Sequence, residues 1–297
     1  MSSRTPYQLV GIDGGGTGCR VLIQDTRGET LGEAQAGPAN YTTDARAAIR
    51  NICAALNEAA DGAGLGSNWK DGCIAHAGLA GVMDDKDAQS ISAALQIEHI
   101  TVTDDRATSV AGALREEDGI LAAIGTGTIV AFSSERTIRY FGGWGHDLAD
   151  QASGGWLGHD ALRLSLLALD GFMPHSDLTK DLLRRFNDDP LGIVRFAQNA
   201  EPGDYAAFAP MVVEAARADD PHATSLMCKG AAFLEGCIQA SGAGTNDAIC
   251  LAGGVGPHYK PYLAAKYQSR IRPPKGSALD GALFLAKQQH THLEAAT

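Results

Sequence analysis

Two spacings of apolar residues alternate along the chain, and each spacing predicts a different kind of element. Short apolar runs, such as the one around Val10 and Ile12, have the length of buried strands. Other segments carry apolar residues three or four positions apart, as at Ile49, Ile52 and Leu56, which places them on one face of a helix. Because strands that alternate with helices favour right-handed crossovers, we expect an α/β protein with a largely parallel sheet.

The order of these elements repeats within the chain. The first half predicts strands over 8–13, 20–24, 29–36, 72–78 and 99–103, with helices over 44–60, 84–95 and 106–114. From Gly119 the opening order of strand, glycine turn, strand, turn and strand begins again, over 119–124, 129–133 and 136–142. The remainder predicts helices over 154–169, 177–186, 191–198, 205–217, 222–241 and 277–288, and a strand over 248–252.

This repeat predicts two domains, residues 1–115 and residues 116–297, with a boundary that is least defined near 112–118. The last helix could pack back on the first domain. A chain of 297 residues is long enough for two domains of ordinary size. A hydrophobic content of 44% with 20% charged residues is typical of globular proteins rather than disordered ones.

The net charge of −11 argues against a partner that is a nucleic acid or an anionic membrane surface. An anionic ligand would have to be held by backbone amides and a metal ion. No apolar run approaches the length of a membrane span, and residues 1–6 lack the apolar core of a signal peptide. The cysteines are scattered without a CxxC pair, which is typical of reduced thiols, so we expect a cytoplasmic protein.

The turn Asp13-Gly14-Gly15-Gly16-Thr17 joins two apolar strands and is a candidate phosphate site. Glycines let backbone amides approach a ligand without a Cβ atom in the way, and oriented amides bind anions. A carboxylate beside a phosphate requires a cation between them, so Asp13 suggests a magnesium–nucleotide complex. The alternative is an ordinary β-hairpin turn.

Two further glycine turns, Gly125-Thr126-Gly127-Thr128 and Gly253–Gly256, each follow an apolar strand. The chain contains neither the P-loop pattern nor the G-x-G-x-x-G pattern of dinucleotide-binding folds. What fits instead is a pair of glycine hairpins, one in each half, that would grip phosphates from two sides. The third turn would then meet the adenosine.

In this order, the DGGGT, GTGT, GGWGH and AGGVG motifs resemble the actin-like ATPase superfamily of sugar kinases. Within it, the chain is similar to the N-acetylglucosamine and glucosamine kinases, also called BadF/BadG-type ATPases. The resemblance spans about residues 8–288 and includes Pro38-Ala39-Asn40 and Thr103-Asp104. It implies two actin-like, ribonuclease H-like domains with a nucleotide cleft between them, and ATP and Mg²⁺ as cofactors.

Carried over to matching positions, the resemblance also implies individual roles. Asp13 would organise Mg²⁺ through water. The residues implied to contact the nucleotide are Asp13, Gly15, Gly16, Thr17, Gly125, Thr126, Gly127, Ala206, Gly253 and Gly254. The residues implied to contact the sugar are Asn40, Asp104, Thr128, Gly143, Trp144, Gly145 and Asp150.

The segment Thr103-Asp104-Asp105 ends a strand just before a helix, where α/β sheets place their chemistry, and the resemblance implies that Asp104 is the catalytic base. Phosphoryl transfer to a sugar needs a carboxylate that accepts the hydroxyl proton. We expect Asp105 to cap the following helix, although Asp104 could also be that cap. Asn40 could be only a turn residue, and Trp144 could be a core aromatic. His146 has no partners at metal-ligand spacing and stays unassigned.

The acceptor suggested by the motifs is glucosamine. The acetylated-sugar kinases usually have Asp-Glu-Gly at this position. Here the segment is Asp150-Gln151-Ala152-Ser153-Gly154, which is more similar to the bacterial glucosamine kinases. Asp147 and Asp150 could pair with the sugar ammonium through charge-assisted hydrogen bonds. We therefore expect ATP-dependent phosphorylation of D-glucosamine at the 6-hydroxyl, with N-acetylglucosamine as the second candidate acceptor.

Two functions of another class compete with the kinase. The nucleotide turns would also suit an ATPase that activates a partner enzyme, although no cysteine follows a glycine turn at the spacing of a shared iron–sulfur cluster. A sugar-sensing regulator is also compatible with them, although no basic segment precedes Asp13. The partner expected is a small amino sugar, and a homodimer is one assembly that we allow for.

Overall fold

The computed structural model describes residues 7–135 and 137–295. The chain forms two compact units. The first unit contains the residues up to Glu116 together with the segment that begins at Pro274, and the second unit is Glu117–Pro273. The closing segment, whose placement the sequence left open, thus belongs to the first unit.

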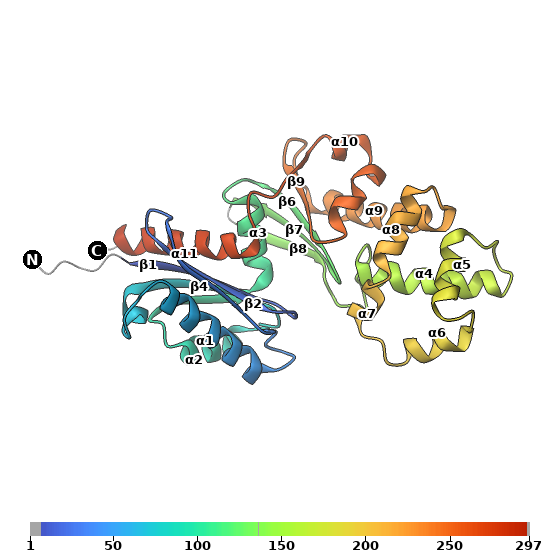
Figure 1. The fold of residues 1–297 in the computed structure, drawn as a ribbon. Coiled ribbons are helices and arrows are strands. Elements are labelled where there is room, and N and C mark those ends of the chain that lie inside the picture. Colours follow the sequence, from blue (N-terminus) through green and yellow to red (C-terminus); the bar gives the residue numbers. More distant parts are fainter. Residues whose placement is uncertain (1–6, 136, 296–297) are drawn as a thin grey trace, which may run out of the picture. The chain divides into compact units, whose positions relative to one another are not determined.

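The first unit is built on a five-stranded sheet with the strand order β3-β2-β1-β4-β5 (Figure 1). β2 is antiparallel to β1 and β3, whereas β4 is parallel to β1 and β5. Every residue of β4 is buried, as expected of a central strand that is covered on both faces. The strands are β1 (Gln8–Gly14), β2 (Cys19–Asp25), β3 (Thr30–Ala36), β4 (Cys73–Leu79) and β5 (His99–Asp104).

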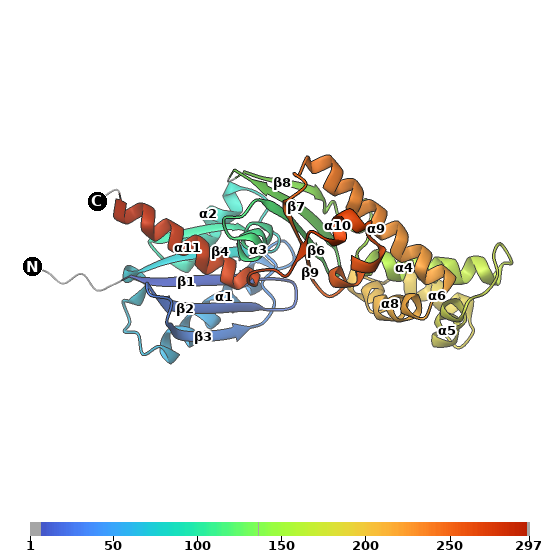
Figure 2. The ribbon, with the colours of Figure 1, turned by 90° about the horizontal axis from the view of Figure 1, so that it is seen from above.

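Helices cover both faces of this sheet, with α1 on one face and α11 beside α3 on the other (Figures 1 and 2). The crossing of α3 and α11 is close, because a Cβ atom at Gly112 would lie 2.0 Å from the Ser277 carbonyl oxygen. A Cβ atom at Gly281 would lie 1.9 Å from the Thr108 carbonyl oxygen. The helices are α1 (Ala45–Gly62), α2 (Asp85–Leu95), α3 (Asp105–Leu114) and α11 (Ala278–Ala295), with a 3-10 helix η1 (Trp69–Gly72).

The second unit repeats the plan of the first with a five-stranded sheet of order β10-β9-β6-β7-β8. β7 is antiparallel to β6 and β8, while β9 is parallel to β6 and β10. The repeat and the α/β class are confirmed. The two-residue strand β10 was missed, and Arg136, the expected start of one strand, lies outside the described residues. The strands are β6 (Gly119–Ile124), β7 (Thr128–Ser134), β8 (Thr137–Gly142), β9 (Ala248–Ala252) and β10 (Ile271–Arg272).

The helix expected over 205–217 was wrong, because the chain forms two helices there, α7 and α8. α7 packs so tightly on α4 that a Cβ atom at Gly158 would lie 1.9 Å from the Tyr205 carbonyl oxygen.

Among residues 7–135 and 137–295, no helix combines the length and the apolar character needed to cross a bilayer. The helices of the second unit are α4 (Gly154–Leu169), α5 (Asp177–Arg185), α6 (Pro190–Ala197), α7 (Pro202–Ala206), α8 (Ala209–Arg217), α9 (Pro221–Ser241), η2 (Gly256–Tyr262) and α10 (Ala265–Gln268).

Candidate active site

The carboxyl ends of β1, β4 and β5 meet at one edge of the first sheet, and two predicted site residues lie there. Asp13 pairs with Gly78 of β4, and Gly78 pairs with Thr103 of β5, so the three strands end at the same level of the sheet. Asp104, the last residue of β5, therefore lies at the same edge as Asp13. Such an edge of parallel strands is where open α/β sheets place ligands. We call it the acid edge.

Asp13 forms an ion pair with Arg20 across the first hairpin. The two residues are register partners on β1 and β2, and the Arg20 guanidinium lies 2.5 Å from Asp13 Oδ2. The Asp13 side chain is only 15% exposed, whereas Arg20 is 47% exposed. The carboxylate is thus fixed at the acid edge, and its counter-ion lies closer to solvent. No motif in the sequence singled out Arg20.

The glycines of the first hairpin turn have different roles. A Cβ atom at Gly14 would lie 2.6 Å from Leu79 Cδ2, so this glycine is needed for packing. Over residues 7–135 and 137–295, a Cβ atom at Gly16 would have no neighbour within 4 Å. The turn is closed by a hydrogen bond from the Gly15 amide to the Gly18 carbonyl oxygen, and Gly16 and Thr17 are exposed. The amides of the exposed residues could bind an anion, so the hairpin interpretation and the phosphate interpretation are compatible.

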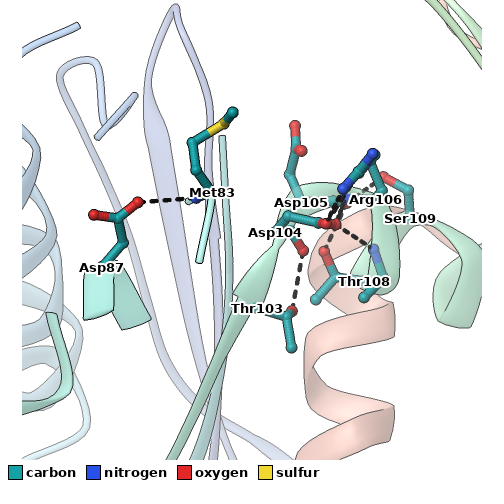
Figure 3. Close-up of polar contacts among 9 residues, drawn as sticks. Met83, Asp87, Thr103, Asp104, Asp105, Arg106, Thr108 and Ser109 are labelled. Carbon is teal, nitrogen blue, oxygen red and sulfur yellow. Dashed lines mark hydrogen bonds and ion pairs between the residues drawn. The ribbon is translucent and has the colours of Figure 1, made fainter. Parts of the chain in front are cut away.

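Asp104 is the N-cap of α3, and our assignment of that cap to Asp105 was wrong. Asp104 Oδ1 accepts hydrogen bonds from the backbone amides of Arg106 (2.9 Å) and Ala107 (3.2 Å) (Figure 3). Its backbone is extended, as a cap residue requires, whereas Asp105 already belongs to the helix. Asp104 Oδ2 accepts from the Arg106 guanidinium through Nε (3.0 Å) and Nη2 (2.5 Å). The cap does not exclude a catalytic role, because it orients the carboxylate.

Asp105 adds a third carboxylate to the acid edge. Burial raises the pKa of Asp105, and the negative charges of Asp104 and Asp13 raise it further. Figure 3 shows its side chain pointing away from the hydrogen bonds around Asp104. The backbone carbonyl oxygen of Asp105 instead accepts from the hydroxyls of Thr108 and Ser109. The acid edge therefore holds the carboxylates of Asp13, Asp104 and Asp105 against the guanidinium groups of Arg20 and Arg106, and the excess of carboxylates favours a cation.

Asn40 lies in a loop that is joined to the loop after β4. Its Oδ1 accepts a hydrogen bond from the Thr43 amide (3.1 Å), so its role as a turn residue is confirmed. Gly81 has a φ of +81°, and a Cβ atom there would lie 2.4 Å from Asn40 Oδ1. The Thr42 hydroxyl donates to the Gly81 carbonyl oxygen (2.7 Å). These contacts hold Asn40 beside a strand end of the first sheet, and its contact with a sugar stays a prediction.

The glycine turn of the second unit is attached to the start of α4. The amides of Gly154 and Gly155 donate to the carbonyl oxygens of Gly125 (2.7 Å) and Thr126 (3.0 Å). Gly253 has a φ of +80°, and a Cβ atom there would lie 2.2 Å from the Ile124 carbonyl oxygen.

The end of β6 and the start of α4 thus bring together most of the residues expected at the nucleotide. Ala206 belongs to this group, because its Cβ would lie 3.2 Å from a Cβ atom at Gly154. The members are Gly125, Thr126, Gly127, Ala206, Gly253 and Gly254.

Three of the residues expected at the sugar, Thr128, Gly143 and Asp150, lie close together in the second unit. Asp150 Oδ1 lies 3.5 Å from the Thr128 amide, and a Cβ atom at Gly143 would lie 3.6 Å from the Thr128 carbonyl oxygen. Burial raises the pKa of Asp150, opposed by the Thr128 amide and by His146. Thr128 is 3% exposed, and within the described residues its Oγ1 has no hydrogen-bond partner. A buried hydroxyl of this kind has capacity left for a ligand.

Trp144 is 75% exposed, so the interpretation as a core aromatic was wrong. Gly145 follows it with a φ of +90°, and Leu148 in the same loop is 79% exposed. The loop is anchored instead by His146, whose ring stacks on Tyr205 of α7 with the centroids 5.3 Å apart. Contact of Trp144 and Gly145 with a sugar stays a prediction.

The family model of the BadF/BadG/BcrA/BcrD ATPases matches residues 10–271. The chain belongs to this ATPase family. The matched span begins in β1 and ends in β10, so it includes strands of both sheets but not α11.

Proteins similar to this chain carry the names of amino-sugar kinases. The glucosamine kinase GspK of Vibrio cholerae is 33% identical over 95% of this chain and 96% of its own length. An N-acetylmuramic acid/N-acetylglucosamine kinase of Clostridium acetobutylicum is 27% identical over 59% of this chain and 58% of its own. A solved structure from Chromobacterium violaceum, assigned provisionally as an N-acetylglucosamine kinase, has a TM-score of 0.85. It is 30% identical and covers 95% of this chain and 99% of its own.

Three contacts of this BadF-type ATPase were not predicted from the sequence. The Tyr259 hydroxyl, which is fully buried, donates to the carbonyl oxygen of Ala152 (2.8 Å), just before α4. Nothing in the sequence signals that contact. The pairing of Arg20 with Asp13 depends on hairpin register. Only Arg106 had a local signal, because its position two residues after Asp104 repeats the spacing of Asp25 and Arg27.

Proposed function

We propose that this chain is an ATP-dependent amino-sugar kinase that phosphorylates D-glucosamine at the 6-hydroxyl. The observation that carries the proposal is the 33% identity with a glucosamine kinase along nearly the whole length of both chains. The acid edge supports it, because it offers a fixed carboxylate to a reaction that needs positioning and one proton acceptor.

In the proposed reaction Asp104 is the general base. The oxygen of the sugar 6-hydroxyl attacks the γ-phosphorus of ATP, and Asp104 accepts the hydroxyl proton. The bond between the γ-phosphorus and its bridging oxygen breaks, and ADP leaves. The two helix amides that bind Asp104 Oδ1 fix the carboxylate, which leaves Oδ2 as the atom that receives the proton.

Both units would contribute to ATP binding. In the first unit, Gly15, Gly16 and Thr17 would donate amides to the phosphates, supported by the exposure of the last two. In the second unit, Gly125, Thr126 and Gly127 would form the other phosphate turn. Gly253, Gly254 and Ala206 would border the adenosine, where small residues allow close approach of a flat base.

Magnesium fits the acid edge. Burial is the main cause of the raised pKa of Asp105, and the charges of Asp104 and Asp13 raise it further; a divalent cation would relieve that repulsion. Within the described residues no group of three or more His, Cys, Asp or Glu side chains forms a metal cage. Mg²⁺ typically keeps several waters and takes one or two carboxylates plus substrate phosphates, so we propose that Asp13 holds it through water. When bound, the ion would neutralise charge on the phosphate oxygens.

The proposed sugar site consists of the turn-bound Asn40, Asp104 and the cluster around Thr128. Asp150 is a half-buried carboxylate beside the Thr128 hydroxyl, which has no hydrogen-bond partner in the described part of the chain, and an ammonium donates to acceptors of both kinds. Asp147 is exposed in the same loop and would add negative charge. These acceptors and negative charges favour the free amine of glucosamine. Gly143, Trp144 and Gly145 would cover the sugar from the loop before α4.

The test is phosphorylation of a panel of hexoses and amino sugars with ATP, with the phosphorylated position located by NMR. We expect the highest kcat/KM on glucosamine, with phosphate on the 6-oxygen. N-acetylglucosamine is the second candidate, favoured by the Chromobacterium violaceum likeness, and a strong preference for it would overturn the choice of acceptor. An activator ATPase or a sensor would release no ADP in response to sugar. Light scattering on the same preparation would test the homodimer.

A further inference from the structure

All acceptor positions of the candidate base, the Asp104 carboxylate, are taken by hydrogen-bond donors in the structure. A carboxylate offers about four lone-pair positions to donors, and Asp104 has four donor contacts among the residues that the structure describes. Two are backbone amides at Oδ1, and two are guanidinium N–H groups of Arg106 at Oδ2. A base that receives a proton from a hydroxyl needs a free lone pair. Arg106 and the sugar hydroxyl therefore compete for the same oxygen atom.

We propose that Arg106 is a latch that occupies Asp104 until a sugar binds, and that it thereby suppresses hydrolysis of ATP by water. This inference rests on the proposed function, because it takes Asp104 as the base of a sugar kinase. Arg106 is a positioning residue in this account. It acts on the reaction only through Asp104.

The geometry allows the latch to open without loss of the base. The Arg106 side chain is 39% exposed, so it can leave toward solvent, and a partly exposed ion pair is weak enough for substrate contacts to replace. Its place in the first turn of α3 is unfavourable for a cation, because the helix dipole is positive there. The amides that hold Oδ1 belong to the backbone, so the carboxylate stays in place when the guanidinium leaves.

The latch has a chemical purpose in a kinase. With Oδ2 free and no sugar present, a water molecule could give its proton to Asp104 and attack the γ-phosphorus. The bond to the bridging oxygen would break, and ADP and inorganic phosphate would form. A guanidinium on Oδ2 blocks that proton transfer. A sugar replaces it because the sugar contacts several residues together, whereas a water molecule does not.

A second Asp-x-Arg contact in the first unit provides a matched control. The Arg27 amide donates to Asp25 Oδ1 (2.9 Å) and Arg27 Nε donates to Asp25 Oδ2 (2.8 Å), which is the pattern seen at Asp104. This pair lies at the turn between β2 and β3, away from the acid edge. The contact itself is thus a local motif, and only its position on the candidate base makes it a latch.

The experiment compares the wild type with Arg106→Gln, Arg106→Lys, Arg27→Gln and the double variant Arg106→Gln/Asp104→Asn. Two quantities are measured: ADP release from ATP without sugar, and the Kd of glucosamine without nucleotide, by calorimetry. For Arg106→Gln we expect about fivefold faster hydrolysis and about fivefold tighter glucosamine binding, the size of an exposed ion pair. Arg106→Lys should be intermediate, because lysine lacks the planar fork.

Arg27→Gln should match the wild type in both measurements, and the double variant should lose the gain in hydrolysis. Unchanged or slower hydrolysis in Arg106→Gln, or weaker glucosamine binding, overturns the latch. Should that variant fail to fold, the same comparison applies to Arg106→Lys. A wild type that phosphorylates no sugar overturns the proposed function and the latch together. A wild type that phosphorylates glucosamine while Arg106→Gln shows no gain overturns the latch alone.

Discussion

The two sheets share one strand order but differ at the edge where their parallel strands end. In the first unit, Asp13 precedes the last residue of β1, and Asp104 ends β5. In the second unit, Ala123 takes the position of Asp13, one residue before the last strand pair of the hairpin. The neighbouring strand β9 ends in Ala252 and is followed by Gly253. One plan thus yields an edge rich in carboxylates and an edge rich in small residues.

The two hairpin turns differ in the same sense. The turn of the first unit leaves Gly16 and Thr17 exposed, whereas the turn of the second unit leaves only Thr126 exposed among Gly125, Thr126, Gly127 and Thr128. The turn of the second unit has its carbonyl oxygens held by the amides of Gly154 and Gly155 at the start of α4. The difference shows that the shared strand order determines only where candidate site residues lie, at the ends of the parallel strands. A few residues at the strand ends distinguish the two edges: in the proposed reaction proton transfer would fall to the first unit, whereas the second unit offers close backbone approach at Gly253.

The largest expected effect comes from removing the proposed base at the acid edge. Asp104→Asn should lower kcat by about 10² to 10⁴, the usual range for a positioned base, with the KM for ATP nearly unchanged. Asn is as good an N-cap as Asp, so α3 should stay intact. Steady-state kinetics with glucosamine give both quantities. Asp44→Asn, at the N-cap of α1, is the matched control and should keep full activity, and full turnover in Asp104→Asn would reject the assignment.

Acid should weaken the first unit through His76. Burial lowers the pKa of His76 on β4 to about 4, from an ordinary value near 6.5. The unfolded chain then takes up the proton first, so this stability is present above pH 6.5 and is lost as the pH falls toward 4. The loss should reach about 3 kcal/mol at pH 4.

The free energy of unfolding in urea, measured at pH 7 and pH 4.5, tests this prediction. His76→Gln should show a clearly smaller loss between the two values than the wild type, because its side chain does not titrate. His292→Gln, at an exposed histidine of α11, should behave as the wild type. Equal losses in the wild type and in His76→Gln would contradict the role of His76.

Adding a side chain at the small-residue edge should lower the stability of the second unit. Gly253→Ala places a side chain at a φ of +80° and against the Ile124 carbonyl oxygen. The left-handed conformation alone costs about 1–2 kcal/mol for a residue other than glycine, and the contact adds to it. We expect a lower unfolding temperature and a higher KM for ATP. Gly254→Ala has open space around its Cβ and should keep wild-type stability; an equal loss there would refute the steric argument.

The smallest effect is expected from removing the hydrogen bond that holds the segment after Asp150. Tyr259→Phe removes the hydrogen bond to the Ala152 carbonyl oxygen, which should cost about 1 kcal/mol of unfolding free energy. Ala152 has a φ of +70° two residues after Asp150, so the KM for glucosamine should rise while the KM for ATP changes little. Tyr262→Phe in the same 3-10 helix is the control. A selective rise in the KM for ATP would contradict this assignment.

The sequence predicted what depends on local pattern. Apolar runs located most strands, and glycine turns located both hairpins. It failed where a tertiary contact decides the outcome: the close approach of Tyr205 to Gly158 accompanies the break between α7 and α8, which no local signal marks. Adjacent Asp104 and Asp105 were assigned in the wrong order, because either aspartate can cap a helix. The exposure of Trp144 depends on how its whole loop is packed.

The placement of α11 in the first unit has a consequence for how the chain is made. The segment from Pro274 onward leaves the ribosome after the second unit, yet it packs on β1 and β4, where Leu283 and Ala286 join Leu9 and Ile74 in one apolar cluster. The Lys275 amide also donates to the carbonyl oxygen of Ala113 (3.0 Å). During synthesis the part of this sheet face that α11 covers, beside α3, therefore stays exposed while the second unit is translated, and exposed apolar surface of this kind makes an unfinished chain prone to aggregation.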